Sequence, residues 1–144
     1  MRPLISFALS CALMAWSAGA QADLYSDVNR MINSGQWDKA QKEVDQRLKV
    51  APTDPQMRLL LSRIQDAQGQ TQAAMDTLQG LTQSFPELAE PHNNLAVLLA
   101  RQGRHAEALA SLQAAIQARP DYAIALENMG DVYAVLASAA YGKA

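Results

Sequence analysis

The side chains that most often carry enzymatic chemistry are scarce in this chain and are not grouped. Neither of its two histidines, His92 and His105, has a carboxylate at the short helical spacing of a zinc motif such as H-E-x-x-H. Close carboxylate pairs such as Glu127 and Asp131 are common on helix surfaces and need no catalytic role. We therefore predict no catalytic residue, no metal site and no cofactor, and we interpret His92 as a packing residue. The chain is not expected to be an enzyme.

The single cysteine, Cys11, lies in a segment that has the order of a secretory signal peptide. A positively charged start is followed by an apolar run from Leu4 to Trp16 and by the tripeptide Ala20-Gln21-Ala22, which gives an A-x-A site. We predict that residues 1–22 are a signal peptide, cleaved after Ala22 as the first choice and after Ala20 as the second. This predicts a periplasmic protein that is not inserted in the membrane after cleavage.

Two alternatives to a cleaved leader remain open. The first is an uncleaved anchor, although the apolar run is shorter than the roughly 20 residues that span a bilayer. The second is acylation of Cys11, although Ala8-Leu9-Ser10 lacks the leucine three positions upstream of the cysteine that a lipobox has. Without the leader the chain has no cysteine, and 11 basic and 14 acidic residues leave a formal net charge of −3. That weak acidity argues against nucleic acid as a partner.

Three residue types recur every 34 residues through the rest of the chain. The recurring residues are Gly35, Gly69 and Gly103; Ala40, Ala74 and Ala108; and Pro52, Pro86 and Pro120. Strict self-similarity at this length is typical of stacked repeat proteins. We divide the predicted domain, residues 23–144, into units at 21–54 (partly degenerate), 55–88 and 89–122, with a partial fourth unit at 123–144.

Each unit reads as a helix, a tight turn and an antiparallel helix. In the third unit, apolar residues keep helical spacing from Leu95 to Leu99 and again from Ala106 to Ile116. Gly103 stands between the two segments, where a left-handed turn conformation costs glycine little. Pro120 then closes the unit, because proline cannot continue a helix.

The earlier units carry the same signals with local differences. In the second unit, Thr53 or Asp54 can cap the first helix, and Pro55 suits the first helical position. The first unit is looser, with a first helix near residues 24–33. Its second helix opens at Trp37, which we interpret as a packing residue.

These residues resemble the tetratricopeptide repeat. The matching residues are His92, Leu95, Ala96, Leu99, Gly103, Ala108, Leu112, Ala115 and Pro120 in the third unit, and Leu126, Met129, Gly130 and Tyr133 in the fourth. The second unit departs from the family pattern at Ser62 and Gln65, and the first departs at Asp27. The resemblance covers residues 23–144 and implies an all-α, right-handed superhelical solenoid of antiparallel helix pairs.

The resemblance also implies a concave face, built from the first helix of each unit, that holds an extended or helical peptide. By position in the repeat this face should carry Gln56, Leu59, Arg63, Asp66, Glu90, Asn93, Val97, Arg101, Ile124, Glu127, Asn128 and Asp131. We predict peptide contacts from Arg63, Asn93, Arg101 and Asn128. Arginine offers carboxylates a planar fork of donors, and asparagine can satisfy peptide donors and acceptors alike. Since both charge signs are mixed on this face, neither an acidic nor a basic partner is predicted.

Some members of the family clamp the terminal carboxylate of a partner with lysine, asparagine and arginine from successive units. Asn128 matches one such position, but Asn93 and Val97 stand where the clamp needs lysine and asparagine. We do not expect this clamp here.

The sequence stops within the fourth unit. Tyr141-Gly142-Lys143-Ala144 resembles Trp37-Asp38-Lys39-Ala40, the opening of a second helix, but comes two residues later than the period predicts. We favour a truncated chain, and a lone final helix acting as the cap is the alternative.

We expect a non-catalytic scaffold or adaptor that binds a peptide or protein segment, in the assembly or maturation of envelope proteins. One alternative is a self-associating structural module, because the apolar residues from Val132 to Leu136 make a poor terminal cap. The other is a regulatory arm of a larger protein.

Overall fold

The computed structural model describes residues 22–143, so the predicted signal peptide, apart from Ala22, and Cys11 within it lie outside the described residues. This part of the chain forms seven helices and no strand. The helices span residues 22–33, α2 (Trp37–Val50), α3 (Pro55–Ala67), α4 (Thr71–Ser84), α5 (Ala89–Arg101), α6 (His105–Ala118) and α7 (Ala123–Tyr141). The predicted all-α solenoid of helix pairs is confirmed.

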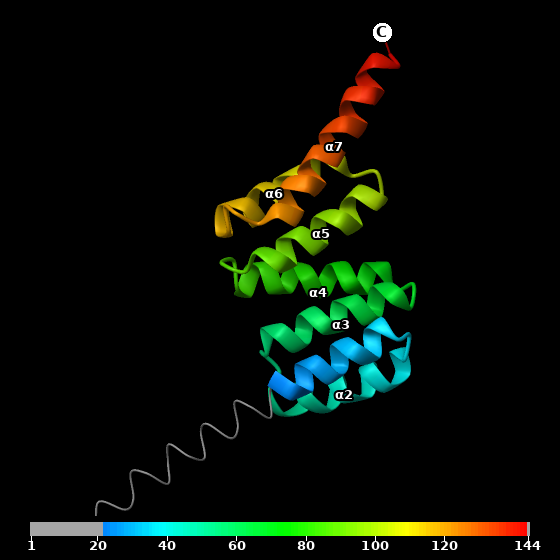
Figure 1. The fold of residues 1–144 in the computed structure, drawn as a ribbon, viewed down its shortest axis with the longest axis vertical. Helices are drawn as coiled ribbons and strands as arrows, with labels where there is room; N and C mark the ends of the chain where they lie inside the picture. Colours follow the sequence, from blue (N-terminus) through cyan, green and yellow to red (C-terminus); the bar gives the residue numbers. More distant parts are fainter. Residues whose placement is uncertain (1–21, 144) are drawn as a thin grey trace, which may run out of the picture.

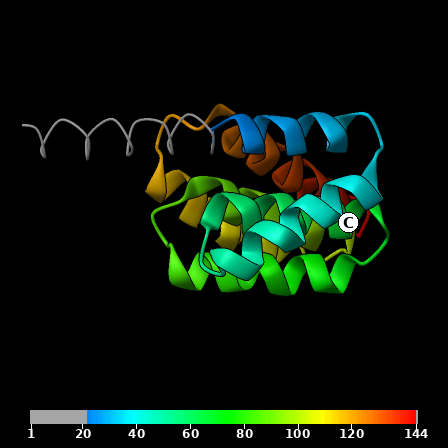
Figure 2. The ribbon, with the colours of Figure 1, turned by 90° about the horizontal axis from the view of Figure 1, so that it is seen from below.

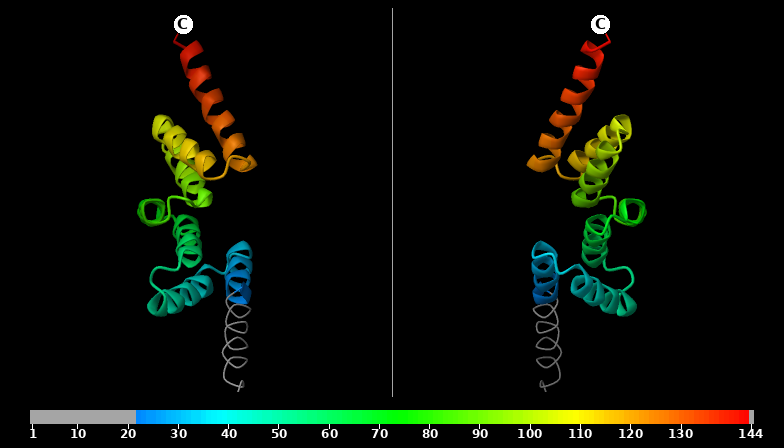
Figure 3. Two further views of the ribbon diagram at one scale, coloured as in Figure 1. Left: turned by 90° about the vertical axis from the view of Figure 1, so that its left-hand side faces the viewer. Right: turned by 90° about the vertical axis from the view of Figure 1, so that its right-hand side faces the viewer.

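The helices stack along one axis, with residues 22–33 and α2 at one end and α7 at the other (Figure 1). Seen along the stack, the helix of residues 22–33 and α7 lie toward one side and α4 lies toward the other (Figure 2). The side views show the same offset: the row formed by residues 22–33, α3, α5 and α7 is bowed (Figure 3). The first helices of the units therefore line the concave side of the stack.

The three turn glycines end the first helix of each unit at the same position of the repeat. Gly35, Gly69 and Gly103 have φ of 74°, 78° and 76°, a region that side-chain-bearing residues rarely adopt. In each turn the residue after the glycine donates its N–H to a carbonyl five residues back, as Arg104 does to Leu99 at 3.0 Å. This is the hydrogen bond of a Schellman cap, which ends a helix and reverses the chain.

In the second unit, the two residues that depart from the family pattern, Ser62 and Gln65, both form hydrogen bonds. Ser62 is buried in α3, and its hydroxyl donates to the Leu59 carbonyl at 2.7 Å. Gln65 accepts a hydrogen bond of 2.8 Å from Thr77 on α4, which ties the two helices of the unit together. The predicted cap is also present, because Asp54 accepts from the Met57 N–H at 3.1 Å and Pro55 is the first residue of α3.

The C-terminal helix differs from the expectation. It begins at Ala123, in phase with α5, but runs without a turn to Tyr141. Ala137 stands 34 residues after Gly103 and does not favour the left-handed turn conformation, so the helix continues. The prediction that Tyr141 opens a second helix is wrong, since Tyr141 is the last residue of α7.

Buried side chains form two clusters that meet at α3. The N-terminal cluster contains Val28, Ile32, Ala40, Val44, Met57, Leu60 and Ile64, with Trp37 packed against it as expected. The C-terminal cluster joins Leu59 of α3 to α4, α5, α6 and α7, and includes Leu78, Leu99, Leu112 and Val132. Each side of α3 therefore supports a different part of the stack.

Candidate functional site

The concave face holds three shallow hollows that adjoin one another, and we call them together the groove. The N-terminal hollow, of about 370 Å³, is lined by Ile32, Asn33, Trp37, Arg63, Asp66 and Ala67. The middle hollow, of about 220 Å³, is lined by Ser62, Arg63, Asp66, Leu78, Asn94, Val97 and Leu98. The α5/α7 hollow, of about 280 Å³, is lined by Ala96, Val97, Ala100, Arg101, His105, Leu112, Asn128, Asp131, Val132 and Val135. Adjacent hollows share Arg63 and Asp66, and then Val97, so the groove is continuous.

Arg63 joins the first two units across the groove. Its guanidinium donates to Asn29 Oδ1 and, at 3.2 Å, to Asn33 Oδ1, both on the helix of residues 22–33. The side chain lines two of the hollows while its donors contact the preceding unit. Arg63 is therefore placed where a ligand would lie, but it also has a structural role.

Arg101 makes the next cross-link. Its Nη2 lies 2.5 Å from Asp66 Oδ1, which joins α5 to α3. Because the Arg101 side chain is about half exposed (53%), the ion pair is screened by solvent and contributes little to stability, in the range of about 0–1 kcal/mol. Its main effect on the groove is electrostatic, since the arginine charge is already balanced by the Asp66 carboxylate.

Asn128 and Asn93 form the third cross-link. The Asn128 amide donates to Asn93 Oδ1 at 2.8 Å, which joins α7 to α5. Asn93 is only 4% exposed and lines none of the three hollows. The structure thus places Arg63, Arg101 and Asn128 on the groove wall, and it places Asn93 behind Asn128 as a buried hydrogen-bonding partner.

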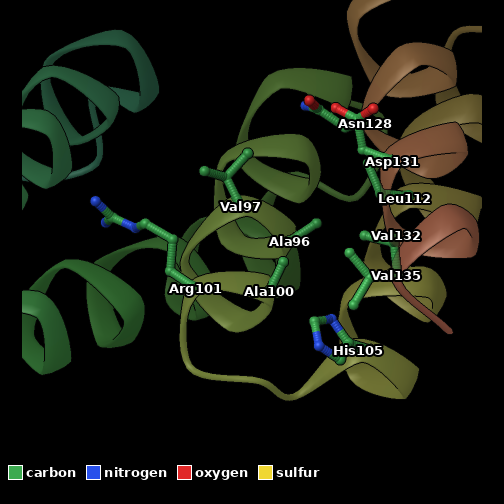
Figure 4. A pocket seen from close by; sticks show the side chains of 10 residues that line it. All are labelled: Ala96, Val97, Ala100, Arg101, His105, Leu112, Asn128, Asp131, Val132 and Val135. Carbon is green, nitrogen blue, oxygen red and sulfur yellow. The ribbon is translucent and has the colours of Figure 1, made fainter. Parts of the chain in front are cut away.

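The α5/α7 hollow has apolar walls with polar side chains at its margins (Figure 4). Valine and alanine side chains from α5 and α7 face one another across it, and Leu112 of α6 lies beneath. Asn128 and Asp131 stand at one end and His105 at the other. The Nδ1 atom of His105 is buried and has no hydrogen-bond partner among the described residues.

The acidic residues of α7 have a different environment from the arginines. Asp131 lines the α5/α7 hollow, and Glu127 lies one turn earlier on the same helix. Both are exposed, and neither forms an ion pair with any residue between 22 and 143. The uncompensated charge at this end of the groove is therefore negative. Sequence reasoning missed this, because the ion pair between Arg101 and Asp66 is not visible in the repeat positions.

Two further features of the described residues bear on the type of site. Between residues 22 and 143, no three His, Cys, Asp or Glu side chains gather as they would to hold a metal ion. Among the helices in the same part of the chain, none has the length and apolar character needed to cross a bilayer.

Sequence comparison identifies the repeat. A model described as tetratricopeptide repeat matches residues 32–98, and a model described as TPR repeat matches residues 98–136. The two matches adjoin and together cover most of the chain. A comparison with curated protein sequences found no significant match.

Solved structures share the fold. The Sgt2 TPR domain from Aspergillus fumigatus is 18% identical, with a TM-score of 0.76 over 85% of this chain and 83% of that one. TTC0263, a TPR protein of Thermus thermophilus, is 26% identical, with a TM-score of 0.71 over 81% and 66%. The Yersinia enterocolitica type III secretion chaperone SycD, in complex with a peptide of the translocator YopD, is 21% identical, with a TM-score of 0.69 over 88% and 96%.

Proposed function

Because the chain belongs to the tetratricopeptide repeat family, we propose that it is a protein-interaction scaffold that holds a peptide or protein segment in the groove. The observation that carries the proposal is the continuity of the three hollows along the concave face. SycD, which shares this fold, has been solved with a peptide of its translocator. Proteins of this repeat family act in general as non-catalytic scaffolds, and we propose the same for this chain.

The groove suits a segment of chain better than a compact small molecule. Its hollows are shallow and follow one another across α3, α5 and α7, whereas small-molecule sites usually enclose most of the ligand surface. Apolar walls offer surface for partner side chains, and Arg63, Arg101 and Asn128 offer hydrogen bonds along the margins. We therefore propose binding through a few side chains and the peptide backbone.

Site-specific photo-crosslinking tests this function. A photoreactive residue at Val97, which lines two hollows and is 38% exposed, should crosslink a protein partner in a periplasmic extract. The same residue at Val50, which is 76% exposed on α2 and lines none of the three hollows, is the matched control. Equal crosslinking at both positions would count against the groove.

A charge reversal provides the second arm of this test. Arg63→Glu combined with Arg101→Glu should reduce crosslinking at Val97, because it removes the two guanidinium groups that offer hydrogen bonds along the groove margins. A thermal melt must accompany the variant, since both arginines also join neighbouring units. If the variant stays folded and captures the same partners equally well, the assignment of these residues to the binding surface is wrong.

We propose that the protein is exported and acts in envelope protein assembly or maturation, on the basis of the signal-peptide pattern of residues 1–22. N-terminal sequencing of the protein recovered from the periplasmic fraction tests this. We expect a mature chain that begins at Asp23. Recovery in the cytosolic fraction with an intact N-terminus would contradict it.

Self-association through α7 is a second candidate function. This helix exposes Leu126, Tyr133 and Leu136, which are 48%, 50% and 37% exposed, and no charged residue lies between Val132 and Tyr141. Two copies could therefore meet along α7 without charge repulsion. Sedimentation velocity should show a concentration-dependent dimer that Tyr133→Ser with Leu136→Ser abolishes and Val50→Ser does not. A monomer at every concentration rules out this candidate.

A further inference from the structure

The charges on the groove differ in whether they are already compensated. Arg101 is paired with Asp66, whereas Arg63 donates to the neutral amides of Asn29 and Asn33, which occupy its donors but do not compensate its charge. A ligand carboxylate that approached either arginine would have to displace these partners. At the other end of the groove, no ion pair within residues 22–143 compensates the charges of Asp131 and Glu127.

Asp131 also lies beside the most apolar part of the groove. The α5/α7 hollow is walled by Ala96, Val97, Ala100, Val132 and Val135, and Figure 4 shows Asp131 on the same helix as the last two. Its volume of about 280 Å³ accommodates an aliphatic side chain. A branched aliphatic group placed there would leave water and contact several methyl groups at once.

We propose that the α5/α7 hollow selects a peptide segment in which an aliphatic residue lies close to a lysine or arginine. The aliphatic side chain enters the hollow, and the cation pairs with the carboxylate of Asp131, with Glu127 adding to the negative field. The methylene stem of the lysine or arginine packs over exposed Val135, which long basic side chains do readily. This inference rests on the proposed function and specifies the chemistry of the partner.

An acidic segment fits the same place poorly. Its carboxylate would approach Asp131 and Glu127, and the arginine that lines the same hollow, Arg101, is already paired with Asp66. Like-charge contacts of this kind are a common source of discrimination between partners. The preference for a basic segment therefore follows from which groove charges are already paired.

Selection from a random dodecapeptide phage library on the full chain tests the proposal. We expect the enriched peptides to carry Leu, Ile or Val within three positions of Lys or Arg. A fluorescein-labelled synthetic copy of the most enriched peptide then serves as the probe in anisotropy titrations. Its affinity should fall with added salt, because the ion pair with Asp131 is near the surface.

Variants of one carboxylate make the test specific. Asp131→Asn keeps the shape of the side chain and should lower the affinity for the probe peptide about two- to fivefold, as expected for an exposed ion pair. Asp131→Lys should lower this affinity about tenfold or more, and a repeated selection on this variant should enrich acidic peptides. Asp121→Asn is the matched control, because Asp121 is also exposed but lines none of the three hollows, and it should leave affinity unchanged within twofold.

The outcomes separate this inference from the function on which it rests. Enrichment of acidic peptides, or a probe whose affinity is the same for Asp131→Asn and wild type, would overturn the basic-aliphatic preference and leave the groove as a peptide site. Failure to enrich any peptide would overturn both. Enrichment of the expected peptides with loss of affinity only in the Asp131 variants would support both.

Discussion

Asp54 connects three helices through one carboxylate. Its Oδ1 caps α3 by accepting from the Met57 N–H, and its Oδ2 accepts from the Tyr25 hydroxyl at 2.8 Å and from Arg47 Nε at 3.1 Å. Burial alone would raise the pKa of this carboxyl, but the three hydrogen bonds and the Arg47 charge outweigh it and lower the pKa. For the Tyr25 hydroxyl, burial and the bond to Asp54 both raise the pKa.

We predict that Asp54→Ala lowers the free energy of unfolding by about 2–3 kcal/mol at pH 7, because it removes a helix cap and leaves Arg47 unpaired. Since the Asp54 pKa is lower in the folded state, the stability it contributes is fully present above its ordinary value of about 3.8 and is lost as pH falls through the lowered value. The difference in free energy of unfolding between wild type and Asp54→Ala should therefore become smaller below pH 4. Urea titrations at pH 7 and pH 3.5 measure it.

Asp121→Ala is the control for this prediction. Asp121 is exposed, and the change should alter stability by less than about 0.5 kcal/mol at either pH. A gap between wild type and Asp54→Ala that stays constant as pH falls would show that the ionised carboxylate is not what stabilises the fold.

At the scale of the helices and turns, one glycine ends a helix and another lies inside one, although both have room for a larger side chain. Gly103 has φ of 76° and ends α5, whereas Gly130 lies inside α7. A Cβ added at either position would meet nothing within 4 Å. Any effect of alanine must therefore come from the local backbone conformation and from the unfolded chain, with no clash against side chains packed nearby.

We predict that Gly103→Ala destabilises the protein by about 1–2 kcal/mol, because alanine is strained in the left-handed region. Gly130→Ala should stabilise it by about 0.5–1 kcal/mol, because alanine loses less conformational freedom than glycine when a helix forms. Urea titrations of both variants at pH 7 test the pair. If the two substitutions change stability in the same direction, the backbone explanation fails.

At the scale of the whole molecule, the stack is held by two clusters of buried side chains rather than by one central core. Leu60 of α3 belongs to the N-terminal cluster, and Leu112 of α6 belongs to the C-terminal cluster. In a stack, each unit contacts mainly its neighbours, so stability is divided into local and interface contributions. Local opening should therefore differ between the two halves.

We predict that Leu60→Ala accelerates amide hydrogen exchange in α2 more than in α6, and that Leu112→Ala does the reverse. The two leucines are equally buried, at 2% and 1% exposed, and each truncation should cost about 2–5 kcal/mol. Exchange followed by mass spectrometry on native protein gives the helix-resolved rates. Equal acceleration in both helices for both variants would mean that the stack opens as one cooperative unit.

The sequence by itself determined the helices and turns of the first three units, but not the length of α7. The period of 34 residues places a glycine at each turn, and the starts of α2, α4 and α6 at Trp37, Thr71 and His105 follow it without deviation. Such features depend on local sterics and on apolar spacing, both of which can be read along the chain. The cap at Asp54 and Pro55 could be read for the same reason.

Only the tertiary structure decided which polar side chains of the groove are already bonded. Arg63 contacts Asn29, Arg101 contacts Asp66, and Asn128 contacts Asn93, each across about one repeat. Whether such residues meet depends on how closely successive units pack, because the donor and acceptor of a hydrogen bond must lie within about 3.2 Å of each other. The period shows which residues share a face, but the curvature of the stack decides which of their charges are compensated. Asp131 lines the groove and has no ion-pair partner between residues 22 and 143.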